Sequence, residues 1–360
     1  MLQQTGDYDA TVKKFEQLRK IGVHSFYFAL DDTAPRVNYD ADRQQFPEHG
    51  PWTQLPDAQA YYLNKVQTEY IKAHQLKDLQ MVPTNYSGSA RDPYKTELEV
   101  RLNRNIRMQW TGEGMFSNHV TTASVQQAKT TYNTDRLFIW DNFPVNDSQR
   151  DRLFLNPLEN SDADLYKYLE GFTSNPMIEP YASMIALQGY ADYTWNPPQH
   201  HPQKSQESII RELAGTYALA SKLTTFVDLN LGWKPYRPES VESPALSKDL
   251  KGFWNGLGSG NNLCTADLAH RVSTLKALPK DLSGIAEKGF FNDSKPWIDV
   301  TGQWASMVDY DMAALQALKS SDLATASSSI STTRLPPSSM LHYLLRPCRS
   351  YSYCQPTRPQ

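Results

Sequence analysis

The chain has 360 residues, a net charge of −3 and a pI near 6.3. It is long enough for one large domain with an appendage, and its charge gives no reason to expect nucleic acid or an anionic membrane as a partner. No apolar run approaches the roughly 20 residues that span a bilayer, and residues 1–7 lack the segments of a signal peptide.

A helix is predicted over residues 8–20, and the most informative stretch of the chain follows it at residues 24–32. This short apolar and aromatic run ends in two adjacent carboxylates, Asp31 and Asp32. Its length and composition predict a strand, and its largely apolar faces favour a parallel sheet covered by helices. Alternation places Tyr27 and Asp31 on the face expected to line a barrel interior. Carboxylates at the C-terminal end of such a strand stand where catalytic groups of a β/α barrel are found.

The succession of helix and strand continues along the chain. A polar loop at residues 33–58 is expected to lie over the site. Further strands, each ending in polar or aromatic residues, are predicted over 79–86, 106–112, 137–142 and 169–176. Five strands are fewer than the eight of a closed barrel. The expected fold is therefore α/β, a (β/α)8 barrel whose strands 4–8 are present and whose first three are missing from this chain.

The second half of the chain is predicted to be helical, with breaks at Pro and Gly. Residues 1–228 are expected to form a partial barrel and residues 229–322 an all-helical appendage. The tail at 323–360 is rich in Ser, Thr, Pro and Arg, which cannot build a core, so it is expected to be disordered or to be a frameshifted end.

Adjacent carboxylates suit a reaction in which one group donates a proton while the other orients the substrate or stabilises charge. In a conventional glycosidase the two carboxyls flank the sugar from different strands, so neighbours fit better the exception in which the sugar's own 2-acetamido oxygen is the nucleophile. The alternative is that Asp31 and Asp32 simply cap a turn or bind a cation. A metal site at His200 and His201 is not expected, because no Cys or carboxylate stands at ligand spacing. The three cysteines likewise form neither a metal-ligand set nor a disulfide framework.

Five motifs follow one another in the chain: Leu30-Asp31-Asp32, Val82-Pro83-Thr84-Asn85-Tyr86, Trp110-Thr111-Gly112-Glu113-Gly114, Trp140-Asp141-Asn142-Phe143-Pro144-Val145-Asn146-Asp147 and Asn175-Pro176. In this order they resemble glycoside hydrolase family 84. That family comprises β-N-acetylglucosaminidases, including bacterial enzymes labelled hyaluronidase and the eukaryotic O-GlcNAcases. The resemblance covers roughly residues 8–200, and five motifs in order are far more specific than any one of them.

The resemblance implies a role for each carboxylate. Asp31 is expected to orient and polarise the acetamido group, and Asp32 to act first as general acid and then as base. It also implies substrate-binding residues: Tyr86 beside the acetamido group, Thr111 and Met115 lining its pocket, Trp140 as its wall, Asn142 as a partner of the reacting groups, and Asp147 and Asn175 on the outer hydroxyls of the sugar.

The implied activity is that of a retaining exo-β-N-acetylglucosaminidase that acts on glycans or glycoproteins bearing GlcNAc and needs no cofactor. The resemblance further implies a secreted or cell-surface bacterial enzyme. The family's sugar-binding lysine and a glycine contact belong to the first strands of its barrel, and nothing in this chain matches them. One alternative is therefore an inactive GlcNAc-binding remnant. Another is a conventional two-carboxylate glycosidase with Asp141 as the nucleophile.

Overall fold

The structure is a computed structural model that describes residues 5–159, 161–232, 239–259 and 263–332. These residues divide into two compact units. The first unit holds the described residues up to 145 together with 157–176 and 186–205, and the second holds 146–156, 177–185 and the described residues from 206 onward. The predicted division at residues 228 and 322 follows other boundaries and stays a prediction.

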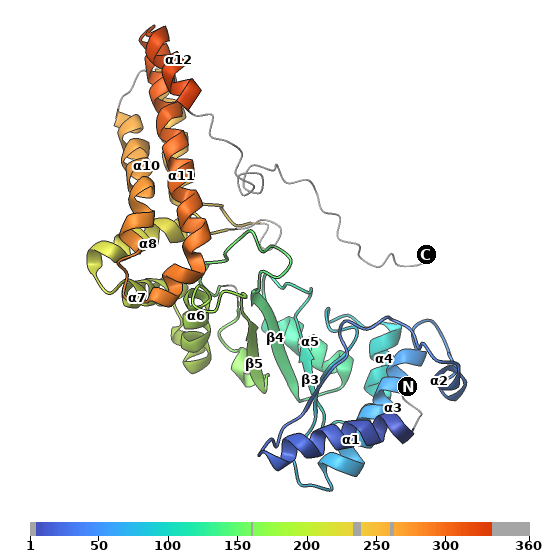
Figure 1. The fold of residues 1–360 in the computed structure, drawn as a ribbon. Helices are drawn as coiled ribbons and strands as arrows, with labels where there is room; N and C mark the ends of the chain where they lie inside the picture. Colours follow the sequence, from blue (N-terminus) through green and yellow to red (C-terminus); the bar gives the residue numbers. More distant parts are fainter. Residues whose placement is uncertain (1–4, 160, 233–238, 260–262, 333–360) are drawn as a thin grey trace. The chain divides into compact units, whose positions relative to one another are not determined.

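All strands of the first unit belong to one parallel sheet in the order β1-β2-β3-β4-β5 (Figure 1). They are β1 (Tyr27–Ala29), β2 (Gln80–Val82), β3 (Arg107–Trp110), β4 (Leu137–Pro144) and β5 (Gly171–Asn175). Each lies inside or overlaps one of the five predicted strands, so the α/β class and the parallel sheet are confirmed. Within the described residues the sheet is open, with β1 and β5 at its edges, and its assignment to strands 4–8 of a (β/α)8 barrel stays a prediction.

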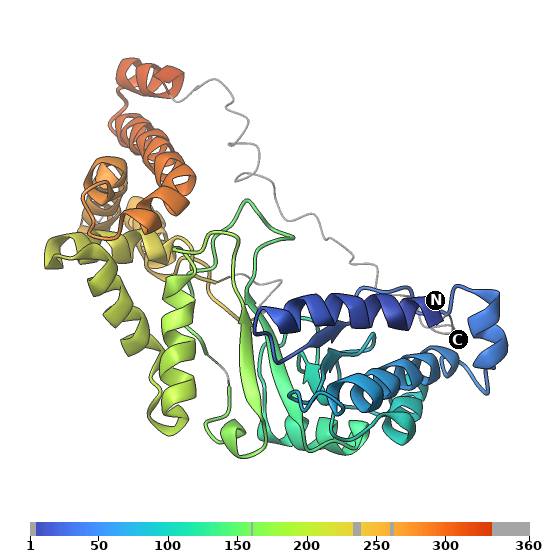
Figure 2. The same ribbon diagram turned by 60° about the horizontal axis from the view of Figure 1, so that its bottom comes forward.

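Helical segments precede β1, lie between successive strands and follow β5, and the ribbon is drawn in Figures 1 and 2. They are α1 (Thr5–Lys20), α2 (Asp40–Gln45), α3 (Gln54–Lys65) with its π-helical continuation (Val66–Ile71), α4 (Pro93–Arg101), α5 (Thr122–Tyr132), α6 (Met184–Trp195), and 3-10 turns at Leu165–Lys167 and Pro197–Gln199. The loop over 33–58 is more ordered than predicted, because Val37, Phe46 and Ala58 are buried together in a small core of their own.

The two faces of β1 differ as alternation predicts. Phe26 stacks on Phe15 of α1, with ring centroids 4.1 Å apart, and Phe28 meets Tyr62 of α3 edge-on. The opposite face, predicted to line a barrel interior, is not covered at this edge strand: Tyr27 is 37% exposed and Ala29 is also exposed. The predicted packing of one face of this strand against helices is therefore confirmed. The predicted burial of the opposite face is wrong for the described residues.

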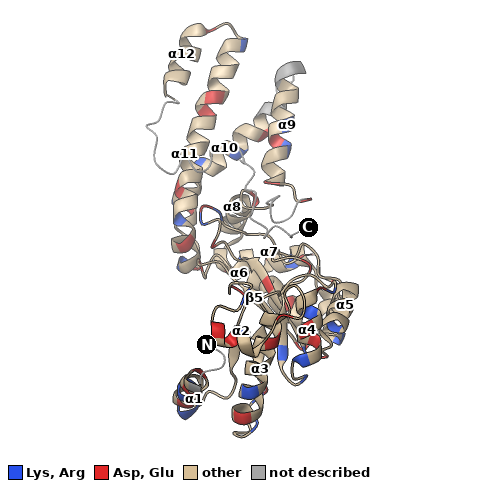
Figure 3. Cartoon of the chain, turned by 90° about the vertical axis from the view of Figure 1, so that its right-hand side faces the viewer, with Lys and Arg blue, Asp and Glu red and all other residues tan. Residues whose placement is uncertain are grey.

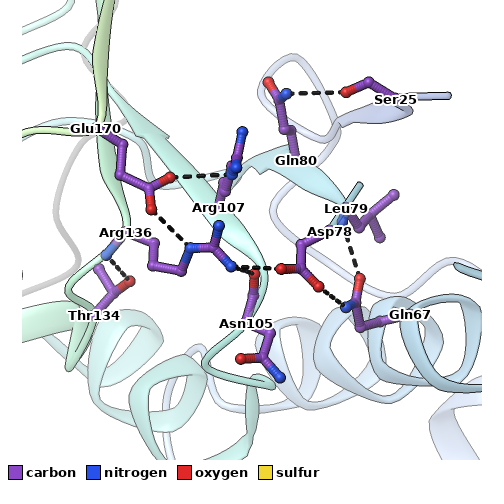
Figure 4. Close-up of polar contacts among 10 residues, drawn as sticks. All are labelled: Ser25, Gln67, Asp78, Leu79, Gln80, Asn105, Arg107, Thr134, Arg136 and Glu170. Carbon is purple, nitrogen blue, oxygen red and sulfur yellow. Dashed lines mark hydrogen bonds and ion pairs between the residues drawn. The ribbon is translucent and has the colours of Figure 1, made fainter. Parts of the chain in front are cut away.

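A network of ion pairs joins the strands at their amino ends (Figure 4). Arg136 pairs with Asp78 at 2.6 Å and with Glu170 at 2.8 Å, and Arg107 pairs with Glu170 at 3.0 Å. Gln67 donates to Asp78 over 2.6 Å. These side chains stand before or at the start of β2, β3, β4 and β5, so the network ties four strands together at the edge opposite the one where the motifs lie.

The second unit is helical. It contains the larger part of α7 (Pro202–Ala214), and α8 (Tyr217–Asp228), α9 (Pro244–Ser259), α10 (Leu263–Leu282), α11 (Lys288–Lys319) and α12 (Leu323–Thr332). Gly302 of α11 lies so close to α10 that an added Cβ would stand 2.7 Å from Pro279. Residues 323–332, part of the predicted disordered tail, form α12, and residues 333–360 lie outside the described residues.

Charged residues of both signs are distributed over the helices of each unit (Figure 3). In the described part of the chain, no helix is both long enough and apolar enough to cross a membrane.

Candidate active site

The carboxyl ends of parallel strands meet at one edge of a sheet, and this edge gathers the predicted site residues of the first unit. Asp31 and Asp32 follow β1, Tyr86 follows β2 and Thr111 follows β3 directly. Four more lie at this edge: Met115 between β3 and α5, Trp140 and Asn142 in the second half of β4, and Asn175 as the final residue of β5. The strand order β1 to β5 thus sets the order in which these side chains line the edge.

The carboxylate pair stands in a turn at the end of β1. Asp31 is half-buried and Asp32 is exposed, so both can reach solvent or a ligand. The turn begins at Leu30, whose N–H donates to the carbonyl of Val82 over 3.2 Å and whose carbonyl accepts from Thr84 Oγ1 at 2.6 Å. Backbone and side-chain bonds from the β2 segment therefore hold the residue that immediately precedes the two carboxylates.

The negative charge of this pair contributes to the raised pKa values of two tyrosines. Burial raises the pKa of Tyr86, and the charges of Asp32 and Asp31 raise it further. Burial likewise raises the pKa of Tyr27 far above its usual range, with the charge of Asp31 adding to it. Both hydroxyls keep their protons at neutral pH and can donate hydrogen bonds.

The loops after β2 and β3 are bonded to each other. Thr111 N–H donates to the carbonyl of Tyr86 over 3.1 Å, and Gly88 N–H donates to the carbonyl of Gly112 over 2.8 Å. Gly112 has φ +96°, and a Cβ on it would stand 2.0 Å from Ser117 Oγ, so this position requires glycine. These bonds fix Tyr86 relative to the end of β3.

Thr111 is buried, and its side chain shapes the following loop. Its hydroxyl donates to the carbonyl of Gly114 over 2.8 Å, and Ser117 donates to the carbonyl of Thr111 over 2.9 Å. The loop carries Met115, whose side chain is 44% exposed and whose carbonyl accepts from Asn142 Nδ2 at 2.9 Å. The Met115 carbonyl therefore contacts Asn142, and the role of Met115 in lining the acetamido pocket stays a prediction.

The orientation of the Asn142 amide follows from its partners. Trp140 Nε1 can only donate and lies 2.9 Å from Asn142 Oδ1, whereas the Met115 carbonyl can only accept and lies 2.9 Å from Nδ2. Asn175 Nδ2 also donates to Asn142 Oδ1, over 2.9 Å. Asn142 therefore joins the ends of β4 and β5 to the loop after β3.

Asp141 points to the other side of the sheet from its two neighbours. Its Oδ2 lies 2.7 Å from the hydroxyl of Tyr190 on α6, and the residue is only 8% exposed. Since Trp140 and Asn142 face the opposite way, the hypothesis of Asp141 as a nucleophile beside Asp31 and Asp32 is wrong.

Asp147 belongs to the second unit, where it is exposed in a turn after β4. The neighbouring Asn146 is fully buried, and its Nδ2 donates to Glu179 over 2.8 Å and to the carbonyl of Arg152 over 3.0 Å. Asn146 therefore anchors the segment that carries Asp147. The sugar-binding role of Asp147 stays a prediction.

Comparison with known proteins decides the family. The family model described as beta-N-acetylglucosaminidase matches residues 1–228, well over half of the chain. The chain belongs to the β-N-acetylglucosaminidase family. This is the assignment that the five motifs predict, and the family is one of glycoside hydrolases.

Among members of the β-N-acetylglucosaminidase family, the chain is similar to the protein O-GlcNAcases of Rattus norvegicus and Mus musculus. It is 26% identical to each over 189 residues, which is 51% of this chain. The matched region spans only 19% of the length of these curated relatives.

In structure, the chain is similar to a mutant of the O-GlcNAc hydrolase of Thermobaculum terrenum, with a TM-score of 0.83 and 24% identity. The match covers 92% of this chain and 70% of the other. At this level of identity the likeness shows the fold.

Two residues that support the candidate site of this family member are not predicted from the sequence. Thr84 bonds to the residue before the carboxylates, and Asn146 anchors the segment of Asp147. Both lie inside the motifs named above, and a small polar residue near the end of a strand could have indicated a structural role at the site.

The histidines considered as metal ligands lie apart from this edge. The ring of His200 packs edge-on against Tyr193, 5.5 Å between centroids, and burial lowers its pKa. In the described ranges no three His, Cys, Asp or Glu side chains gather as a metal site would require.

Proposed function

We propose that this β-N-acetylglucosaminidase family member hydrolyses terminal β-linked GlcNAc from glycans or glycoproteins, with retention of anomeric configuration and through an oxazoline intermediate. The observation that supports this most directly is the adjacent pair Asp31 and Asp32 at the carboxyl end of β1, with the donor hydroxyl of Tyr86 close enough to be affected by both charges. Two adjacent carboxylates in one turn suit substrate assistance better than a nucleophile and acid that flank the sugar.

In the proposed first step, the acetamido carbonyl oxygen of the substrate attacks the anomeric carbon. Asp31 accepts a hydrogen bond from the acetamido N–H and so favours the developing positive charge on that group. The bond from the anomeric carbon to the leaving oxygen breaks, and Asp32 transfers its proton to that oxygen. Tyr86 donates a hydrogen bond near the acetamido group.

In the proposed second step, ionised Asp32 takes a proton from water. The water oxygen then attacks the anomeric carbon from the side that the leaving group vacated and opens the oxazoline. Two inversions at one carbon restore the β configuration of the product. Asn142 and Asn175 are proposed to bind the substrate at the ends of β4 and β5. The sugar-binding role proposed for Asp147 rests only on the resemblance of its motif to those of the family.

The sheet is proposed to correspond to strands 4–8 of a (β/α)8 barrel. Support comes from its parallel order, from the helices between its strands and from the polar residues at its carboxyl edge.

The test compares the full chain with Asp32→Ala and Asp31→Ala on two β-GlcNAc glycosides, p-nitrophenyl and methyl. The p-nitrophenolate leaving group needs little protonation, so loss of the acid should reduce its release far less than the release of methanol. Asp32→Ala is therefore expected to lose about 100-fold or more on the methyl glycoside and far less on the aryl one. Asp31→Ala should slow both.

Hydrolysis of p-nitrophenyl β-glucoside, which lacks the acetamido group, at a comparable rate would contradict substrate assistance. Binding of GlcNAc by the wild-type chain without turnover of either glycoside would contradict the proposed activity.

A further inference from the structure

The ladder between β1 and β2 ends in an unusual way at Leu30. Leu30 N–H donates to the carbonyl of Val82, as in a parallel ladder. If the ladder continued, the backbone N–H of Thr84 would be the donor to the Leu30 carbonyl. The Thr84 N–H instead donates to the hydroxyl of Tyr94 over 3.0 Å, and the Thr84 side chain takes its place, with Oγ1 2.6 Å from the Leu30 oxygen.

The hydroxyl of Thr84 is held in this position by two buried residues from α3 and α4. Gln59 Nε2 donates to Thr84 Oγ1 over 2.7 Å, and the hydroxyl of Tyr94 donates to Gln59 Oε1 over 2.5 Å. Gln59 is 4% and Tyr94 2% exposed, so neither group can exchange its partner for bulk water.

Each donor in this set has one direction. The Thr84 N–H bonds to the Tyr94 oxygen, the Tyr94 proton goes to Gln59, the Gln59 amide N–H goes to Thr84 Oγ1, and the Thr84 proton goes to the Leu30 carbonyl. Burial raises the pKa of Tyr94 well above its usual range, so its hydroxyl keeps the proton that the relay needs. The relay therefore orients the Thr84 hydroxyl as a donor to the carbonyl that precedes Asp31.

A second hydroxyl closes the other end of the turn. Thr33, which follows Asp32 directly, has its Oγ1 3.0 Å from the Leu30 carbonyl and 3.0 Å from Thr84 Oγ1. The residue after the carboxylate pair, Thr33, therefore contacts both the carbonyl of the residue before the pair, Leu30, and the hydroxyl of Thr84.

We propose that Thr84, held by Gln59 and Tyr94, is a positioning residue that fixes the turn carrying Asp31 and Asp32. Thr84 acts on the reaction only through those carboxylates, so its effect on catalysis rests on the proposed function. Its effect on the turn does not. Misplacement of catalytic groups by about 1 Å can cost on the order of 100-fold in rate.

The first experiment uses the full chain and two substitutions. Thr84→Val keeps the volume and removes the hydroxyl, whereas Thr84→Ser keeps the hydroxyl. Thr130→Val is the control, because the exposed Thr130 hydroxyl donates to the carbonyl of Gln126 within α5. The rates on p-nitrophenyl and methyl β-GlcNAc are measured for each.

For Thr84→Val, kcat on the methyl glycoside is expected to fall by about 10- to 100-fold, with KM within about 3-fold. The ratio of the aryl to the methyl rate should rise at least about 10-fold, because a misplaced acid matters most for a poor leaving group. Thr84→Ser and Thr130→Val should keep the wild-type ratio. A fall of both rates by the same factor would show loss of folded protein only and would overturn the positioning role.

Tyr94→Phe tests the relay from its other end. Because the two residues belong to one chain of bonds, the double variant Thr84→Val with Tyr94→Phe should change the rate ratio no more than Thr84→Val alone. Additive effects would show that Tyr94 does not act through Thr84.

Hydrogen exchange followed by mass spectrometry tests the positioning role without any activity. If the wild-type chain hydrolyses neither glycoside, only the proposed function is contradicted, and the exchange experiment still decides the role of Thr84. Exchange in the segment 30–34 is expected to be about 10-fold faster in Thr84→Val than in Thr84→Ser, with helix α5 unchanged in both. Equal protection of 30–34 in the two variants would overturn the positioning role.

Discussion

Among single residues, the side-chain amide of Asn142 has only one orientation that satisfies its hydrogen-bond partners in the candidate site. Asn142 accepts from Trp140 and Asn175 and donates to the Met115 carbonyl. Reversal of this amide would set donor against donor and acceptor against acceptor at each contact. The site is therefore pre-organised at Asn142 by partners from two strands and one loop.

Replacement of Asn142 by Asp tests this arrangement. A carboxylate oxygen would then stand 2.9 Å from the Met115 carbonyl, the present distance of Nδ2, and two acceptors repel each other there. We expect kcat/KM on the aryl glycoside to fall by about 30- to 100-fold, equal to roughly 2–3 kcal/mol of transition-state stabilisation.

The control is Asn133→Asp, at the C-cap of α5, where the backbone is left-handed and Asp is tolerated. It should keep wild-type kinetics. If Asn142→Asp also stayed within about 3-fold of wild type, the fixed amide would not matter to the reaction.

At the scale of elements, the sheet has a functional edge and a structural edge. The carboxyl edge carries the predicted site, while the amino edge carries the ion pairs of Asp78, Arg107, Arg136 and Glu170 (Figure 4). Because these four side chains come from segments at the start of four strands, each ion pair also fixes the position of one strand relative to another.

The amino edge predicts an acid-dependent stability. Burial by itself would raise the pKa of Asp78, but the hydrogen bonds from Arg136 and Gln67 outweigh it and hold the pKa below the ordinary value of 3.8. A carboxyl with a lowered folded-state pKa stabilises the fold above its unfolded pKa, and this contribution is lost as the pH falls through the folded pKa. Asp78→Asn should therefore flatten the decline of the free energy of unfolding below about pH 4.

Urea denaturation of wild type and Asp78→Asn between pH 3 and pH 6 measures this difference. Asp135→Asn is the matched control, since the Asp135 side chain is fully exposed in its pair with Lys129. Parallel pH profiles for Asp78→Asn and wild type would show that the network does not contribute.

At the scale of the whole molecule, the second unit is assembled from segments far apart in the chain. Trp297 of α11 donates to the carbonyl of Asp151 over 2.9 Å, and Asp293 of α11 accepts from Tyr181 N–H at 2.7 Å. An added Cβ on Gly289 would stand 2.4 Å from the Tyr181 ring, so α11 and this segment are closely packed. The segments 146–156 and 177–185 thus depend on a helix that begins more than 100 residues later.

A chain ending at residue 228 tests this dependence and the predicted domain boundary together. It lacks α11, so the segments 146–156 and 177–185 should lose their protection from hydrogen exchange, while β3 in the first unit keeps it. Asp293→Asn in the full chain is the milder variant and should weaken protection of 177–185 alone. Unchanged protection of both segments in the shortened chain would support an independent domain at 1–228.

The class of fold, the approximate positions of the five strands and the family follow from local sequence. Apolar runs of strand length that end in polar residues depend on local composition, and five motifs in order are specific without any structure. Asp31, Asp32, Tyr86 and Asn142 were therefore identifiable as site residues, although their roles remain proposals.

Which side chains touch follows from the tertiary packing. The bond of Thr84 to Leu30 joins residues 54 positions apart, and the pairing of Asp141 with Tyr190 depends on which face of β4 meets α6. The tertiary packing also decides that α11 supports the segment of Asp147. Such contacts arise from the packing of elements that are distant in the chain, and local propensity and periodicity contain no information about them.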